Sequence, residues 1–194
     1  MTNLAYDDLY FEDIGEEMLN GVIVMMAPKP NLRHYCASDN INSIFKRYIK
    51  GKTCRAFGDN VDVYLTELDR VVPDAMIVCK KDIIKETGVH GSPDLIVEVL
   101  SPSTAKRDKG YKKDLYERCG VKEYWIVDIN NKSIEIYLLL NGKYKLDNVY
   151  IIQPDYMLEG MTEEEKAELV YEFKTSLFDD FIIDIREVFE DIDI

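Results

Sequence analysis

Two acidic residues stand inside apolar segments of this 194-residue chain. Asp74 follows Pro73 within the run Val71–Val78, and Glu98 is at the centre of Asp94–Leu100. Burying a carboxylate is costly unless a partner neutralises it, and a divalent cation is one such partner. Mg²⁺ needs only one or two carboxylates because it keeps several of its waters. Such a pair is what a metal-dependent phosphodiesterase requires, since the ion in such an enzyme polarises a phosphoryl oxygen and activates a bound water.

A purely structural role is the alternative for Asp74 and Glu98. Each could mark the edge of a strand or pair with a core arginine or tyrosine, because structural ion pairs also use such positions. Alternate side chains of a strand share a face, so Asp94, Ile96, Glu98 and Leu100 are predicted to point the same way. If the metal hypothesis holds, Asp74 and Glu98 lie on adjacent strands with carboxylates close enough to share one cation.

The sequence around Glu98 resembles the Uma-two family of bacterial endonucleases. Gly91–Thr104, with Arg107–Gly110 and Lys112 after it, carries the most specific part of the similarity. Further matching segments are Glu17–Gly21, Met26-Ala27-Pro28, His34, Val72-Pro73-Asp74 and Gly120–Asp128. The resemblance implies a restriction-endonuclease-like fold of the PD-(D/E)XK type, with Mg²⁺ or Mn²⁺ as cofactor, DNA as partner and a homodimeric assembly.

The same resemblance assigns roles to individual residues. It makes Asp74 and Glu98 the metal-binding carboxylates of a catalytic set that also includes a lysine. The lysine expected two positions after Glu98 is replaced by Leu100 in this chain. The resemblance implies that it has moved to the following helix, where it corresponds to Lys112.

Lys112 also has a simpler interpretation. Asp108 precedes it by four residues, and an ion pair at this spacing on a helix surface stabilises by only roughly 0.3–0.5 kcal/mol. For the functional role we expect an exposed, flexible stem that reaches the carboxylates, so that Lys112→Ala removes cleavage with little change in stability. Lys106 and Arg107 are the cations that could act in its place.

Three further residues form a second tier of candidates. Glu17 could complete the acidic cluster, or could be a solvated end of a strand. His34 could contact a phosphate near the start of a helix, or could be an exposed histidine without a role. Asp94 shares the face of Glu98, but after Ser92-Pro93 it could simply cap the entry to the strand.

The elements that must position these residues follow from periodicity and turn signals. Asn20-Gly21 and Asn141-Gly142 predict two-residue hairpins, and residues 31–50 have the apolar spacing of a helix. A second helix is predicted over 108–119, ending at Gly120. Strands are predicted at 61–65, 71–79, 94–100, 123–128, 133–140 and 143–150. Tyr111, Tyr116 and Trp125 are expected in the core.

Signals in the C-terminal part predict shorter elements. Thr162 and Glu165 form a capping-box pattern that opens a short helix, whereas 181–185 is expected to be extended and followed by a helix from Arg186. The predicted fold class is α/β (α+β), a restriction-endonuclease-like mixed β-sheet flanked by helices with extra N-terminal and C-terminal hairpins or strands. We expect one domain over residues 1–194, with a peripheral acidic helical excursion at about 155–172.

Composition limits the classes of protein to which this chain could belong. Hydrophobic residues make up 46% of the chain, which is enough for a core, and the four cysteines lack metal-site spacing. With no signal peptide or spanning segment apparent, we expect reduced thiols, a cytoplasmic location and no membrane partner. The net charge of −13 is unfavourable for binding phosphates, but the segment 106–113 is locally basic.

The residues thus favour a metal-dependent DNA endonuclease. The alternative is a catalytically inactive module that keeps the nuclease fold and binds nucleic acid or a protein partner. The acidic composition favours this alternative, whereas Asp74, Glu98 and Lys112 favour the enzyme.

Overall fold

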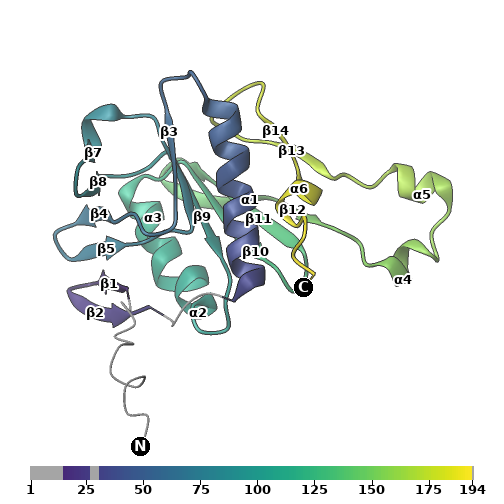
Figure 1. The fold of residues 1–194 in the computed structure, drawn as a ribbon, viewed down its shortest axis with the longest axis horizontal. Coiled ribbons are helices and arrows are strands. Elements are labelled where there is room, and N and C mark those ends of the chain that lie inside the picture. The colour runs from purple at the N-terminus through teal and green to yellow at the C-terminus, as the bar shows by residue number, and fades with distance from the viewer. Residues whose placement is uncertain (1–14, 27–30, 194) are drawn as a thin grey trace, which may run out of the picture.

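The computed structural model describes residues 15–26 and 31–193, and a six-stranded mixed sheet forms its centre (Figure 1). The strand order is β12-β11-β10-β9-β6-β3, and only β9 and β10 of this sheet run parallel to each other. The strands are β3 (Arg55–Gly58), β6 (Ala75–Val78), β9 (Leu95–Val99), β10 (Glu123–Asp128), β11 (Ser133–Leu140) and β12 (Lys143–Ile151).

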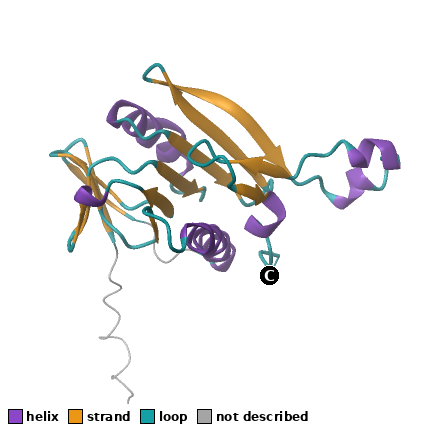
Figure 2. Ribbon diagram, turned by 90° about the horizontal axis from the view of Figure 1, so that it is seen from above, coloured by secondary structure: helices purple, strands orange, loops and turns teal. Residues whose placement is uncertain are grey.

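Helices cover both faces of this large sheet (Figure 2). One face packs against α1 (Leu32–Ile49), which begins where the Asn31 side chain accepts a hydrogen bond from the His34 backbone N–H. The other face packs against a continuous helical segment of three parts. These parts are α2 (Ala105–Arg107), the π-helical turn η2 (Asp108–Lys112) and α3 (Lys113–Cys119), which ends at Gly120 with positive φ.

A second six-stranded sheet contains the N-terminal hairpin, which turns at Asn20-Gly21 as predicted. Its order is β2-β1-β5-β4-β8-β7. The strands are β1 (Glu16–Leu19), β2 (Val22–Met25), β4 (Val63–Thr66), β5 (Asp69–Val71), β7 (Ile84–Lys85) and β8 (Gly88–His90), with the 3₁₀ turn η1 (Lys81–Ile83) before β7. The predicted mixed sheet flanked by helices is thus the large one, and the predicted extra N-terminal hairpin belongs to this second sheet.

Pro73 explains where the two sheets divide. The strand predicted over 71–79 is broken into β5, which belongs to the small sheet, and β6, which belongs to the large one. Proline has no N–H to donate to a strand ladder, so continuous pairing stops at this point. The break leaves Asp74 at the crossing from one sheet to the other, next to β6.

The cysteines correct a further expectation. Arg55 pairs with Val78 in the antiparallel register of β3 and β6, and one step further the register brings Cys54 opposite Cys79. These two cysteines form a disulfide, whereas Cys36 and Cys119 are free thiols. The prediction of four reduced thiols was wrong because sequence spacing does not show which strands pair.

The C-terminal part returns to the large sheet. A two-stranded ribbon of β13 (Glu172–Lys174) and β14 (Ile182–Asp184), followed by α6 (Ile185–Val188), packs against the α1 face. Phe173 lies edge-on to Trp125, with 5.1 Å between ring centroids. No helix within the described ranges 15–26 and 31–193 is both long and apolar enough to cross a membrane.

Between β12 and β13 the chain leaves the body of the fold and forms an arm, residues 155–170 (Figure 1). The arm contains α4 (Asp155–Leu158) and α5 (Glu163–Ala167), and Thr162 and Glu165 form the predicted capping box. No residue of the arm is buried. Its sequence is therefore expected to contribute little to the stability of the core.

Replacing residues 155–169 with a short Gly/Ser linker should change the free energy of unfolding by less than about 1 kcal/mol, because only exposed side chains are lost. Chemical denaturation followed by tryptophan fluorescence measures this change. As a control, Phe173→Ala, just beyond the arm, should cost about 3–5 kcal/mol, since it empties a buried aromatic site. A large loss of stability in the arm deletion would mean that the arm belongs to the core or to a subunit interface.

Candidate functional site

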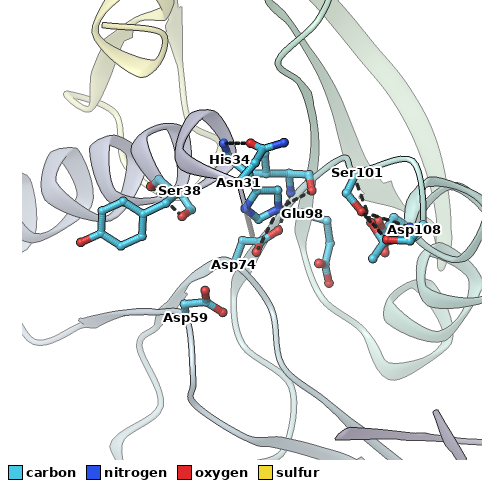
Figure 3. A network of polar contacts seen from close by, with 12 residues as sticks. Asn31, His34, Ser38, Asp59, Asp74, Glu98, Ser101 and Asp108 are labelled. Carbon is cyan, nitrogen blue, oxygen red and sulfur yellow. Dashed lines mark hydrogen bonds and ion pairs between the residues drawn. The ribbon is translucent and has the colours of Figure 1, made fainter. Parts of the chain in front are cut away.

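A pocket of about 190 Å³ lies where both sheets approach the first turn of α1 and the segment α2–η2. In Figure 3, Asp59, Asp74 and Glu98 surround a common space. The carboxylates that line the pocket are those of Glu17, Asp59, Asp74, Glu98 and Asp108.

Asp74 is held by the strand that carries Glu98. Its Oδ2 accepts a hydrogen bond of 2.6 Å from the Val99 backbone N–H, and its Oδ1 lies 3.6 Å from His34 Nε2. Ala75 pairs with Val97 in the antiparallel register, so Asp74, one residue earlier, falls opposite Glu98. Opposed residues of such a pair share a face of the sheet. Burial raises the pKa of Asp74 to about 6, although His34 and the Val99 N–H act in the opposite direction.

Glu98 is 4% exposed and uses one carboxylate oxygen for all of its contacts. Oε1 accepts a hydrogen bond of 2.6 Å from the Tyr116 hydroxyl and lies 2.6 Å from Lys112 Nζ. Burial raises the pKa of Glu98 well above its usual range, although Lys112 opposes this shift. No hydrogen bond or ion pair within the described part of the chain uses Oε2, so this oxygen remains available to a ligand.

A second buried glutamate shows what a fully satisfied carboxylate looks like in this protein. Glu123 accepts a hydrogen bond of 2.6 Å from Trp125 Nε1 on one oxygen, and the backbone N–H and hydroxyl of Ser176 on the other. Both oxygens of Glu123 are therefore occupied by the fold. Glu98 differs because half of its carboxylate is not used for structure.

Lys112 places its ammonium among three carboxylates. Nζ lies 2.6 Å from Glu98, 2.9 Å from Glu17 and 3.8 Å from Asp108. Burial alone would lower the pKa of Lys112, but the surrounding carboxylates, Glu98 first, raise it above its usual value. The residue is only 3% exposed, so the expectation of an exposed stem is corrected. The alternative of a surface ion pair with Asp108 is also excluded.

The π-helical turn η2 explains how a lysine from the following helix reaches the site. A wider helical turn leaves backbone groups without their α-helical partners, and such turns are frequent at functional sites. The Tyr124 hydroxyl donates a hydrogen bond of 3.0 Å to the Asp108 carbonyl within this turn. The helix predicted over 108–119 is confirmed, with a π-helical turn in its first five residues. Leu100, at the usual lysine position, packs against the apolar cluster beneath α3.

Of the three second-tier candidates, Glu17 and His34 line the pocket and Asp94 does not. Glu17 lines the pocket, and its Oε1 accepts hydrogen bonds from Lys112 and from the Val72 backbone N–H. His34 also lines it and donates from Nε2 to the Val99 carbonyl at 2.9 Å. Both are buried, which corrects the alternatives of a solvated strand end and an exposed histidine.

Asp94 is not part of the pocket. Its Oδ1 lies 2.7 Å from Lys122 Nζ, and its Oδ2 accepts a hydrogen bond from the Cys79 backbone N–H. Asp94 shares a face with Glu98, as the alternation predicts, but it lies at the other end of β9. Its contacts match the simpler interpretation, in which Asp94 anchors the entry to the strand.

Sequence reasoning missed several residues that line or support the pocket. Tyr116 was assigned to the core alone; it is fully buried, but its hydroxyl also holds Glu98. Its position four residues after Lys112 places both on one side of the helix, which was a usable signal. Asp59 follows β3 with no motif around it, so no signal pointed to it. The other residues missed were Ser101, Thr104 and Asp108.

The donor set restricts which metal the pocket could hold. Within the described residues, no group of three or more histidine, cysteine, aspartate or glutamate side chains is arranged to bind an ion by itself. Two carboxylates with oxygens directed into a small pocket fit Mg²⁺ or Mn²⁺, because such ions prefer oxygen donors and Mg²⁺ retains waters.

Comparison with solved structures shows the fold. The chain is similar to the protein described as "a putative nuclease belonging to DUF820" from Anabaena variabilis, with a TM-score of 0.67 and 18% identity. The similarity covers 90% of this chain and 89% of that one. The α+β architecture of this protein is thus that of a nuclease-like fold.

The sequence defines the family. Residues 5–166 match the family model described as "Uma2: Putative restriction endonuclease", and the chain belongs to this family. The resemblance noted around Glu98 is confirmed. Ala27 and Pro28, which were part of it, lie outside the described residues. An uncharacterized Synechocystis protein, slr1290, is 27% identical over 106 residues, which cover 54% of this chain and 56% of that relative's length.

Lys112→Met tests whether the ammonium neutralises the buried carboxylates. Removing one partner of a buried ion pair leaves uncompensated charge, so the free energy of unfolding should fall by about 3–5 kcal/mol in metal-free buffer. This replaces the expectation of a small stability change. The measurement is urea denaturation at neutral pH.

Lys106→Met is the matched control, because Lys106 is an exposed lysine of the same helical segment. Its free energy of unfolding should stay within about 0.5 kcal/mol of wild type. Lys112→Met combined with Glu98→Gln should be less destabilised than the sum of the two single variants, because the two side chains are in contact. Additive effects would show that Lys112 does not act through Glu98.

Proposed function

We propose that this protein is a divalent-metal-dependent DNA endonuclease that hydrolyses phosphodiester bonds in the pocket of Asp74, Glu98 and Lys112. The observation that carries the proposal is the buried Lys112 ammonium, 2.6 Å from a glutamate that lies opposite Asp74 across two adjacent strands. Two carboxylates and a lysine are the residue types of the PD-(D/E)XK motif. Membership of the family described as "Putative restriction endonuclease" supports the same chemistry.

Asp74 Oδ1 and Glu98 Oε2 are the oxygens that would hold Mg²⁺ or Mn²⁺. When bound, the ion would polarise the phosphate and lower the pKa of an attacking water. Hydrogen bonds from Val99 and Tyr116 fix the other oxygen of each carboxylate. The metal-binding oxygens are therefore oriented before a ligand arrives, which is the condition for a preorganised site.

Lys112 has an electrostatic role in this proposal. The carboxylates around Lys112 raise its pKa, which favours the protonated ammonium. A fixed ammonium can stabilise negative charge that develops on the phosphate. Glu17 supports this role, because it accepts a hydrogen bond from the ammonium from the small-sheet side.

The alternative is a nuclease fold that binds nucleic acid or a protein without cleaving. The net charge of −13 is the specific observation in its favour. The two functions separate on metal dependence, because a binding module has no need of oriented but unused carboxylate oxygens.

The test is cleavage of single-stranded, duplex and branched DNA with Mg²⁺ or Mn²⁺. Asp74→Asn and Glu98→Gln should each reduce the rate at least about 100-fold, on the scale of lost transition-state stabilisation in other enzymes. Asp94→Asn is the matched control, since it makes the same change at the far end of the same strand and should leave the rate within about threefold.

Thermal unfolding with and without Mg²⁺ gives an independent readout, because an ion that binds only the folded state raises the melting temperature. We expect the rise in wild type and not in Asp74→Asn. A rise without cleavage of any substrate would favour the inactive binding module. Cleavage that persists in Asp74→Asn would exclude the proposed site.

A homodimer is also proposed, as the family resemblance implies. One pocket cuts one strand at a time, and two pockets related by twofold symmetry could cut both strands of a duplex. The edge strand β12 supports this proposal, because it is long and exposes Leu146, Val149 and Ile151. Light scattering coupled to gel filtration should give twice the 22.5 kDa chain mass, and Leu146→Glu should shift it to the monomer. A monomeric wild type would refute the dimer.

A further inference from the structure

Arg107 differs from the other arginines of this chain. All seven arginines lie in the described residues, and six of them donate hydrogen bonds to carboxylates, carbonyls or other side chains. The side chain of Arg107 makes no hydrogen bond and no ion pair with any described residue, although its backbone N–H donates to the Thr104 carbonyl. Its Nε is buried without a partner. A buried donor without an acceptor is costly, and a ligand that accepts a hydrogen bond from this Nε would remove that cost.

The position of Arg107 indicates what that group is. The side chain lines the same pocket as Asp74 and Glu98. Ser101 and Thr104, from the loop that precedes α2, line the pocket beside it, with 3.0 Å between their hydroxyl oxygens. In Figure 3, Ser101 lies on the opposite side of Glu98 from Asp59. A guanidinium next to hydroxyl groups offers several donors to one anion, whereas the carboxylates offer only acceptors.

Asp108, the next residue in the chain, is the acidic group that could pair with Arg107 inside the protein. Its carboxylate is buried, and neither oxygen has a hydrogen-bond partner among the described residues. Lys112, at 3.8 Å, is within ion-pair distance of Asp108, whereas no described ion pair or hydrogen bond joins the Arg107 side chain to it. The charge of Arg107 opposes the rise in the pKa of Asp108 that burial causes, so the two groups influence each other, but Asp108 does not satisfy the Arg107 Nε.

We propose that Arg107, with the hydroxyls of Ser101 and Thr104, forms a phosphate-binding subsite that anchors the nucleic-acid backbone beside the metal-binding carboxylates. The guanidinium fork matches two phosphate oxygens at once, which a lysine cannot do. The inference rests on the proposed nuclease function. It adds a contact that positions the substrate, distinct from the ion and Lys112, which act at the bond that is cleaved.

Binding of a labelled DNA duplex, measured by fluorescence anisotropy over a salt series in EDTA, tests the subsite without turnover. Arg107→Ala should weaken binding about tenfold at low salt and reduce the slope of log K against log salt by roughly 0.9, the value for one phosphate contact on duplex DNA. Arg107→Lys should keep most of the slope, because the charge remains, but recover only part of the affinity. Lys106→Ala is the control: Lys106 is an exposed neighbouring cation with no side-chain partner among the described residues, and its loss should leave the slope unchanged.

Two further measurements separate positioning from structural support. With Mg²⁺, Arg107→Ala should raise KM for duplex cleavage about tenfold with a smaller change in kcat, as expected for a contact made in ground and transition states alike. Its melting temperature should be equal to or above that of wild type, because an unsatisfied buried donor is removed. A clear fall in melting temperature would instead assign Arg107 to support of Asp108 and overturn the subsite.

The outcomes distinguish this inference from the proposed function. Cleavage by wild type with unchanged binding and KM in Arg107→Ala would overturn the subsite and leave the nuclease intact. Duplex binding that depends on Arg107 without any cleavage would support the subsite and refute the nuclease. Equal losses in Arg107→Ala and Lys106→Ala would show general attraction rather than a defined site. Absence of both binding and cleavage by wild type would overturn both proposals.

Discussion

The buried ammonium of Lys112 is the interaction on which the rest of the site depends. It contacts Glu17 from the small sheet and Glu98 from the large sheet, and it is itself carried by the helical segment that crosses between β9 and β10. Without this cation, two glutamates from different layers would face each other in a nearly dry environment. Desolvated like charges of this kind repel strongly. Lys112 therefore joins three layers of the fold at the point where the chemistry is proposed, so stability and function share one residue.

Acidic side chains of the pocket also satisfy backbone groups around Asp74. Pro73 ends the pairing of the small sheet, and the Val72 N–H just before it donates to Glu17. Asp74 Oδ2 accepts a hydrogen bond from the Val99 backbone N–H, next to the end of the β6–β9 ladder. The groups left by the broken strand are thus satisfied by the acidic residues of the pocket, as buried polar groups require. The break in the strand at Pro73, which would otherwise weaken the sheet, therefore helps to orient the carboxylates of Glu17 and Asp74.

Much of this arrangement could be predicted from the sequence, and the failures have physical causes. The Asn-Gly hairpins, the helix over 31–50 and the capping box at Thr162 depend on local conformational preferences, and the structure confirms them. Alternation along β9 placed Glu98 on its face correctly. The division into two sheets, the Cys54–Cys79 disulfide and the burial of Lys112 depend on which strands and helices meet. A single sequence carries little information on such contacts, because they join residues far apart along the chain.

The acidic composition, which argued against a nucleic-acid enzyme, has a different meaning once the charges are placed. Residues 155–168 of the arm carry six acidic side chains and one lysine, and Figure 1 shows the arm projecting from the end of the sheet away from α2. At physiological salt, charges separated by more than about 8 Å of solvent are largely screened. Net charge therefore describes solubility and long-range approach, whereas phosphate binding depends on the few groups at the pocket. There the carboxylates repel an anionic backbone and a bound cation would offset this repulsion, so we expect the affinity for DNA to be weaker in EDTA than with the metal.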